Sequence, residues 1–348
     1  MGQLKTATGN FRIEIEGPEG APALMLSNSL GTDLHMWDPQ IPALTRKFRV
    51  IRYDSRGHGG SIAEPGPYSI AMLGQDALAI MDALALPKTH WLGLSLGGMV
   101  GQWLLAHAPE RLGRVVLANT SSFMPDARPW NARIVNVQKN GMASVTGAVI
   151  ERWFTPEFQS HNPAAVERIA DMLRLTPTQG YIAACAAVRD MDQRETIRRA
   201  NNPTLIIAGT RDPATPPSLC KNIVEAIADS QYVEFDTAHL SNLEEPEAFT
   251  SAVMTFLFAK ADKKSAAKKA PAKKKPAKKK RAAKKPAGKT KVKKAAGKAA
   301  KKTAKKAVKK TVRKKTAVKA VAKKIARRPA PKKTTRKAVK KAKKRSAR

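Results

Sequence analysis

Cysteine, aromatic residues and long apolar runs are scarce in this chain of 348 residues, and each shortage excludes a class of protein. The two cysteines, Cys185 and Cys220, lack paired spacing, which argues against a disulfide framework and for a reducing compartment. No apolar run approaches the roughly 20 residues that span a bilayer. Residues 1–10 also lack the apolar core of a secretory signal. We therefore expect a cytoplasmic protein that does not enter a membrane.

Acidic residues are nearly missing from the C-terminal quarter of the chain. Residues 261–348 hold 42 of the 65 lysines and arginines but only Asp262 of the 27 acids. Residues 1–260 carry the other 23 bases and 26 acids, a net charge of −3. The sequence therefore describes a nearly neutral globular body followed by a polycationic tail, residues 260–348.

The tail repeats lysine, alanine and proline, and its composition resembles the C-terminal tails of histone H1. Its dense like charges repel and its five prolines break helices, so we expect it to be disordered alone. A polycation binds nucleic acid or another polyanion by releasing counterions, without sequence choice. The tail has no aromatic residue, so base stacking adds no specificity. A merely solubilising tail is the alternative.

Apolar runs alternate with helical patterns through most of the body. Strands are expected at 11–16, 23–26, 49–53, 91–94, 115–118, 204–208 and 232–235. A helix is expected over 69–84, with Ser69 as its N-cap and with Asp76 and Asp82 on its polar side. This alternation predicts an α/β fold, a mostly parallel sheet with helices on both faces.

The alternation of strand and helix patterns stops between residues 123 and 199. Helical patterns occur there without a convincing strand, at 135–150, 164–173 and 180–191. We therefore predict an α/β core formed by residues 1–122 and 200–259 and interrupted by a helical cap, residues 123–199.

The run Gly93-Leu94-Ser95-Leu96-Gly97 lies between an expected strand and an expected helix. In that context Gly-x-Ser-x-Gly forms a sharp turn that exposes the serine as a nucleophile. Glycine is needed at both ends because a Cβ would collide with the neighbouring strand or helix. By itself the pattern also fits a glycine-rich turn with an incidental serine.

A serine nucleophile needs a base and an orienting acid, which in this layout follow in the order Ser, Asp, His after later strands. Asp212 follows the strand at 204–208, and His239 follows the strand at 232–235. The order predicts a catalytic triad of Ser95, Asp212 and His239. His58 is better explained as a turn histidine. No histidines show metal-ligand spacing, so we expect no metal.

The oxyanion of the intermediate needs hydrogen-bond donors. We expect one to be the N–H of Leu96, directly after the nucleophile, and the other to come from the loop after the strand at 23–26. There Leu30 is the first choice and Ser29 the second. The Ser29 side chain either contacts substrate or only caps its loop.

These residues now match a known family, because residues 10–258 resemble the 3-oxoadipate enol-lactonases of the α/β-hydrolase superfamily. The Ser27-Asn28-Ser29-Leu30-Gly31 loop is more telling than the elbow, since most relatives carry His-Gly there. The resemblance is carried by residues 26–32, 36–40, 53–59, 93–98, 130–133, 151–156, 209–217 and 238–241. The basic tail is not part of the family pattern.

The resemblance implies hydrolysis of a small enol-lactone to 3-oxoadipate, in aromatic catabolism, through an acyl-enzyme on Ser95 and without a cofactor. The acetate arm of the lactone needs a cationic or donor-rich anchor, for which Arg133 and Trp153 are the choices. They either bind substrate or only tie the cap together. A generic carboxylesterase, a carbon–carbon bond hydrolase, or a DNA-associated protein acting through its tail remain alternatives. The sequence does not indicate an oligomeric state.

Overall fold

The computed structural model describes residues 2–259, and the predictions for the tail, residues 260–348, lie outside the described residues. The body is built on an eight-stranded sheet of order β1-β2-β4-β3-β5-β6-β7-β8. The first two pairs are antiparallel and the remaining pairs are parallel. The strands are β1 (Gly2–Thr6), β2 (Gly9–Glu16), β3 (Ala23–Ser27), β4 (Arg49–Tyr53), β5 (Thr89–Leu94), β6 (Leu112–Ala118), β7 (Thr204–Gly209) and β8 (Gln231–Phe235).

The central strands are apolar because helices cover both of their faces. All six residues of β7 are buried, as expected for a parallel strand inside an α/β layer. The predicted mostly parallel sheet is confirmed. Strand β1 was not predicted, because the polar run Gly2–Thr6 is an exposed edge strand that pairs with β2 across a tight turn.

The helices around the sheet are α1 (Ile41–Leu44), α2 (Ile70–Ala83), α3 (Leu96–His107), α9 (Pro217–Ala226), α10 (Ser241–Glu244) and α11 (Pro246–Phe258), with short 3₁₀ helices η1 (Leu34–Gln40) and η2 (Pro109–Arg111). Helix α2 begins as predicted, since the Ser69 hydroxyl accepts the Met72 N–H at 3.1 Å. Placing Asp76 on a polar face was wrong. Asp76 is buried and accepts two hydrogen bonds from Arg56, at 2.7 and 2.8 Å.

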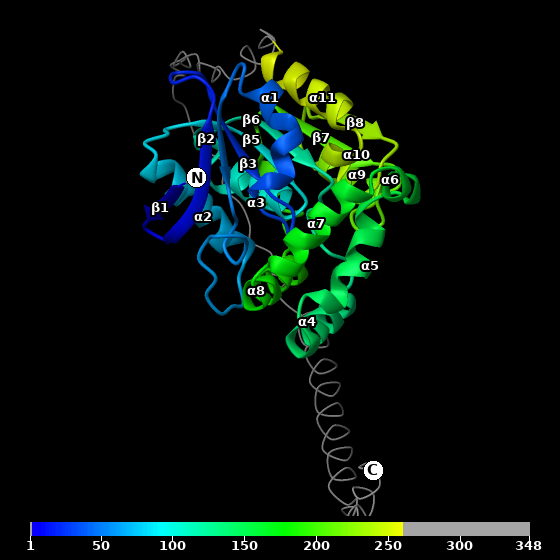
Figure 1. Cartoon of the computed structure of the whole chain (residues 1–348). Helices are drawn as coiled ribbons and strands as arrows, with labels where there is room; N and C mark the ends of the chain where they lie inside the picture. The colour runs from blue at the N-terminus through cyan, green and yellow to red at the C-terminus, as the bar shows by residue number, and fades with distance from the viewer. Residues whose placement is uncertain (1, 260–348) are drawn as a thin grey trace, which may run out of the picture. The chain divides into compact units, whose positions relative to one another are not determined.

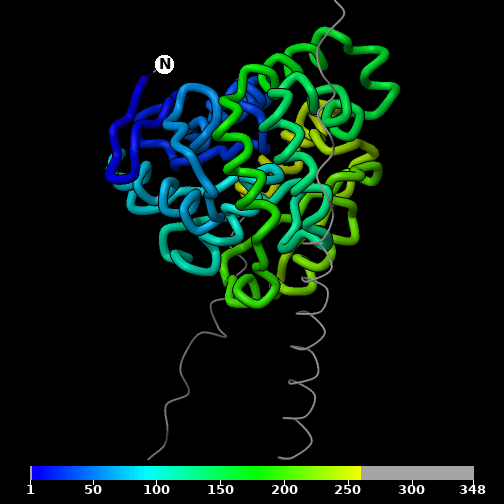
Figure 2. Tube along the Cα trace, turned by 90° about the horizontal axis from the view of Figure 1, so that it is seen from below, coloured from blue at the N-terminus to red at the C-terminus, as the bar shows by residue number. Residues whose placement is uncertain are grey.

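The chain leaves the sheet after β6 and returns to it at β7. Between them lie α4 (Arg128–Asn140), α5 (Ala143–Trp153), α6 (Pro156–His161), α7 (Pro163–Leu175), α8 (Thr178–Asp190) and η3 (Ile197–Arg199). We call residues 123–199 the cap. Figure 1 shows its helices gathered on one side of the sheet, and Figure 2 shows them crossing in front of the body.

The helix predicted over 135–150 is two helices. Gly141 follows α4 with φ of +74°, a conformation that suits glycine and ends the helix, and α5 begins two residues later. Among residues 2–259, no helix has both the length and the apolar character that crossing a bilayer requires.

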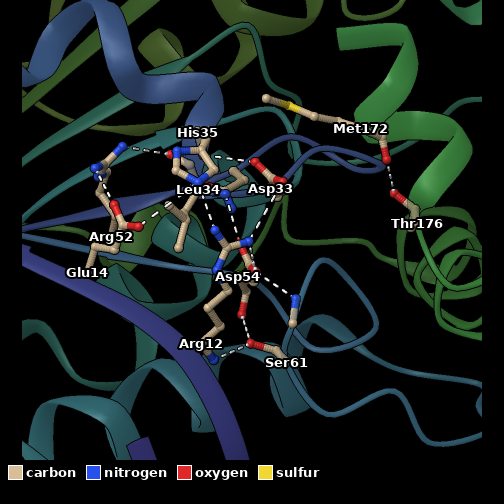
Figure 3. A network of polar contacts seen from close by, with 12 residues as sticks. Arg12, Glu14, Asp33, Leu34, His35, Arg52, Asp54, Ser61, Met172 and Thr176 are labelled. Atoms are coloured by element: carbon tan, nitrogen blue, oxygen red, sulfur yellow. Dashed lines mark hydrogen bonds and ion pairs between the residues drawn. The ribbon is translucent and has the colours of Figure 1, made fainter. Parts of the chain in front are cut away.

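A buried polar network holds the loop that follows β3 (Figure 3). Asp54, at the end of β4, accepts the backbone N–H of Leu34 at 2.8 Å and lies 3.4 Å from the Arg12 guanidinium. The Asn28 side chain accepts from the Trp37 indole and donates to the Tyr53 carbonyl, both at 2.9 Å. The segment from Asn28 to Leu34 is therefore fixed beside the carboxyl ends of the strands.

Candidate active site

Ser95 occupies a strained turn between β5 and α3. Its backbone has φ of +55° and ψ of −112°, a region that residues with a Cβ rarely adopt. A Cβ on Gly97 would lie 2.1 Å from the Ser27 carbonyl oxygen, and one on Gly93 would lie 2.1 Å from the Gly97 carbonyl oxygen. Only glycine at both positions lets strand and helix approach this closely.

Hydrogen bonds to neighbouring strands hold the strained turn in place. The Ser95 N–H donates to the Ala118 carbonyl at 2.9 Å, and the Thr120 hydroxyl donates to the Ser95 carbonyl at 2.8 Å. Both partners come from the end of β6. The sheet edge itself therefore presents the Ser95 side chain.

His239 and Asp212 meet although 27 residues separate them. His239 Nδ1 lies 2.8 Å from Asp212 Oδ2. Since a carboxylate only accepts, Nδ1 carries the proton and Nε2 is left with its lone pair. His239 is 2% exposed, and its Nε2 is the ring nitrogen available for proton transfer.

Asp212 is saturated with donors. Its carboxylate also accepts the Thr215 N–H at 2.9 Å, the Thr215 hydroxyl at 2.7 Å, the Ala214 N–H at 2.8 Å and the Asn119 side-chain amide at 3.1 Å. Burial favours the protonated acid, but the charge and hydrogen bond of His239, together with the Thr215 donors, lower the pKa of Asp212 to about 2. The carboxylate is thus ionised at neutral pH and fixes the orientation of the imidazole.

A cavity of about 450 Å³ lies between the sheet edge and the cap. Of the eight residues predicted for the site, two do not border it: Asp212, which reaches it through His239, and Leu96, whose N–H begins α3. The other six all line it: Ser29, Leu30, Ser95, Arg133, Trp153 and His239. The structure therefore brings residues from both ends of the body to one cavity.

Two backbone donors near Ser95 are free. Among residues 2–259, no acceptor is found for the N–H of Leu30 or of Leu96. The Ser29 N–H, the second choice, is already directed at the Met36 sulfur at 3.3 Å. The Ser29 hydroxyl is buried and has no partner in the described chain, so it does not cap its loop.

The cap side of the cavity carries cations and aromatic rings. Arg133 lies over the Trp130 ring at 4.6 Å, and the Trp153 ring stacks against His239 at 6.2 Å. Arg152, which sequence reasoning missed, also lines the cavity, and burial and the nearby Arg133 charge lower its pKa. Neither arginine has a carboxylate partner among residues 2–259. Adjacency to Trp153 in the sequence was the one signal that pointed to Arg152.

Two other positions near the site, His58 and Asn119, could have supplied the base or the orienting acid. His58 does not line the cavity: it is buried, its Nδ1 lies 3.1 Å from the Arg56 carbonyl, and burial lowers its pKa to about 4. The loop after β6, where an orienting acid could also lie, holds Asn119, whose backbone has φ of +43°. The Asn119 side chain supports Asp212 instead of replacing it.

Comparison with known proteins decides the family. Residues 22–246 match the profile of the alpha/beta hydrolase fold family. The chain belongs to this family. The hydrolase is 40% identical over 237 residues to 3-oxoadipate enol-lactonase 2 of Acinetobacter baylyi, covering 68% of this chain and 89% of that relative. The family resemblance expected from the motifs is confirmed.

Solved structures agree with the sequence relatives. The hydrolase matches the crystal structure of the enol-lactonase from Burkholderia xenovorans LB400 with a TM-score of 0.73 and 39% identity, over 74% of this chain and 99% of that one. A thermophilic esterase from Thermogutta terrifontis matches with a TM-score of 0.69 and 27% identity, over 74% and 97% of the two chains.

Proposed function

We propose that this hydrolase opens 3-oxoadipate enol-lactone to 3-oxoadipate with Ser95, His239 and Asp212 as its triad. The observation that carries the proposal is one cavity with a buried Ser95 and His239 on one wall and two carboxylate-free arginines on the other. A lactone with a carboxylate arm has complementary chemistry at its two ends. The names of two relatives, both enol-lactonases, support the same substrate.

The first step is attack on the lactone carbonyl. His239 Nε2 removes the proton of Ser95 Oγ as the oxygen bonds to the carbonyl carbon. The N–H groups of Leu30 and Leu96 receive the oxyanion. The ring C–O bond then breaks, and the departing enol oxygen takes the proton from His239. This oxygen stays attached through the acyl chain, and the enol becomes a ketone.

The second step releases the acid. Water gives a proton to His239 Nε2 and attacks the ester carbonyl, and the bond to Ser95 Oγ breaks as the oxygen regains its proton. Asp212 stabilises the imidazolium that forms in both steps. Arg133 and Arg152 hold the carboxylate arm, with Trp153 packed beside His239, and Ser29 contacts the bound substrate from the loop after β3.

We assign the choice of substrate to the cap, residues 123–199, and the chemistry to the core, residues 1–122 and 200–259. A generic carboxylesterase or carbon–carbon bond hydrolase would use the same core wall, and the esterase likeness favours the former. Two unpaired arginines facing the cavity favour an anionic substrate over a neutral one.

The test compares turnover of the enol-lactone with that of a neutral p-nitrophenyl ester of similar acyl length. We expect kcat/KM to be about 100-fold or more higher for the lactone, because only the lactone offers the arginines an anion. Good ester turnover with negligible lactone turnover would contradict the assignment. The assay is run on residues 1–259 and on the whole chain.

A second function belongs to the tail, residues 260–348, which we propose binds nucleic acid or another polyanion without sequence choice. Its 42 bases in residues 261–348 against one acid support this. A gel shift with duplex DNA should show a strong loss of binding between about 50 and 200 mM salt. If residues 1–259 alone retained DNA equally well, the assignment of DNA binding to the tail would be contradicted.

A further inference from the structure

The carboxylate of Glu244 joins the histidine loop to the cap. Glu244 ends the short helix α10, five residues after His239. Its Oε1 accepts the N–H of Ala238 at 2.8 Å, and its Oε2 accepts the N–H and the hydroxyl of Thr155, at 3.2 and 2.6 Å. Thr155 is the N-cap of α6, so one side chain links the residue before His239 to the cap.

A second contact links the residue after His239 to the same cap segment. The Leu240 N–H donates to the Trp153 carbonyl at 3.1 Å, and the Trp153 and His239 rings are stacked at 28°. Both backbone neighbours of His239 are therefore bonded to cap residues 153–155, one directly and one through Glu244.

We propose that Glu244 is a positioning residue that holds the base His239 and the cavity residue Trp153 in register. The inference rests on the proposed function, since it takes His239 to be the base. Its consequence is that cap and base move as one unit, so that a shift of α5 or α6 displaces His239 Nε2 from Ser95.

The donors around Glu244 explain why a glutamate suits this position. Three donor groups face its two oxygens, and a carboxylate accepts at both. The amide of glutamine would turn its NH₂ toward the backbone N–H of either Ala238 or Thr155, so that this hydrogen bond is lost. Aspartate is one methylene shorter and spans less of the gap.

Removing the charge of Glu244 is expected to leave the fold intact. Burial raises its pKa in spite of the Thr155 and Ala238 donors and the nearby Arg211, which is itself paired with Glu157 at 2.7 Å. A raised pKa means that folding favours the protonated acid over the ionised one, so the charge of Glu244 does not itself contribute stability at neutral pH. A neutral glutamine at this position is therefore expected to fold.

The experiment compares Glu244→Gln with Glu247→Gln, an exposed glutamate in the first turn of α11, in the full chain. The readouts are the rate at which a fluorophosphonate labels Ser95, kcat and KM for the lactone, and the low-field proton resonance of His239 Nδ1–H. For Glu244→Gln we expect labelling and kcat to fall about 10- to 100-fold, since small misplacements of a catalytic group cost this much. The resonance should shift or broaden while Tm stays close to that of the parent, and Glu247→Gln should behave like the parent.

Parent-like labelling and an unmoved resonance in Glu244→Gln would overturn the inference. The proposed substrate fails separately, if the parent is labelled at Ser95 but does not open the lactone, and labelling and resonance then still test Glu244. Should Glu244→Gln not fold, Thr155→Val removes the hydroxyl donor from the same link. Thr155→Ser restores this donor, so it should recover most of the labelling rate that Thr155→Val loses, and no recovery would count against the link.

Discussion

The acid behind the core wall of the cavity and the arginines on the cap wall differ in how their charges are paired. Behind the core wall, Asp212 accepts hydrogen bonds from His239, Thr215, Ala214 and Asn119. On the cap wall, Arg133 and Arg152 have no carboxylate partner among residues 2–259. The hydrogen bonds of Asp212 are complete before substrate arrives, whereas half-buried arginines without a carboxylate partner gain from binding an anion. This difference supports the proposal that the core carries out the chemistry and the cap selects the substrate.

The largest expected effect comes from removing the nucleophile on the core wall. Ser95→Ala should lower kcat about 10⁵- to 10⁶-fold for lactone and neutral ester alike, because both use the same acyl-enzyme. The serine hydroxyl makes no hydrogen bond within residues 2–259, so the circular dichroism spectrum and Tm should be unchanged. Near-parent turnover by Ser95→Ala would contradict the assignment of the nucleophile to the core wall.

The next largest effect is expected on kcat when Asp212, the carboxylate bonded to His239, is replaced. Asp212→Asn should lower kcat about 10³- to 10⁴-fold, because the amide stabilises the wrong tautomer of His239. KM should change little, since Asp212 does not border the cavity. Asp236→Asn, an exposed neighbour on the same sheet edge, is the control and should keep parent kinetics. A large rise in KM with kcat intact would mean that Asp212 serves binding instead.

The cap wall is tested with paired substrates. Arg133→Met and Arg152→Met should each raise KM for the carboxylated lactone about 10- to 100-fold and leave a neutral ester nearly unaffected, because each removes a charge-assisted hydrogen bond. Arg128→Met, at the exposed start of the same helix as Arg133, should change neither substrate. Equal losses on both substrates would show that the arginines only shape the cap.

The order of strands and polar residues in the sequence was sufficient to predict which residues form the core wall. Ser95, Asp212 and His239 each follow a parallel strand, and the carboxyl ends of such strands share one sheet edge, so they could be expected to meet. The glycines at 93 and 97 strengthened the prediction of a sharp turn at Ser95, because the turn leaves no room for a Cβ at either position. The role of each residue in catalysis stays a prediction for the experiments above.

The cap and the links between the two walls could not be predicted in the same way. Helical periodicity continued across Gly141, where a positive φ ends α4. Glu244 and Thr155 are 89 residues apart, and nothing in their local patterns indicates contact. Arg152 has the signature of an exposed helical arginine until the fold turns it toward the cavity. Such features depend on how the cap lies against the core.

The smallest expected effect is on the free energy of unfolding in acid. It tests whether Asp212 stabilises the fold in addition to orienting His239. The pKa of Asp212 is about 2 in the folded chain and near 3.8 when unfolded, so ionised Asp212 stabilises the fold above pH 4. This contribution, about 2 kcal/mol, is lost as pH falls from about 4 to 2. Denaturant unfolding of the parent should therefore weaken more steeply over that range than that of Asp212→Asn. Parallel pH profiles would mean that the donors around Asp212 orient His239 without stabilising the fold.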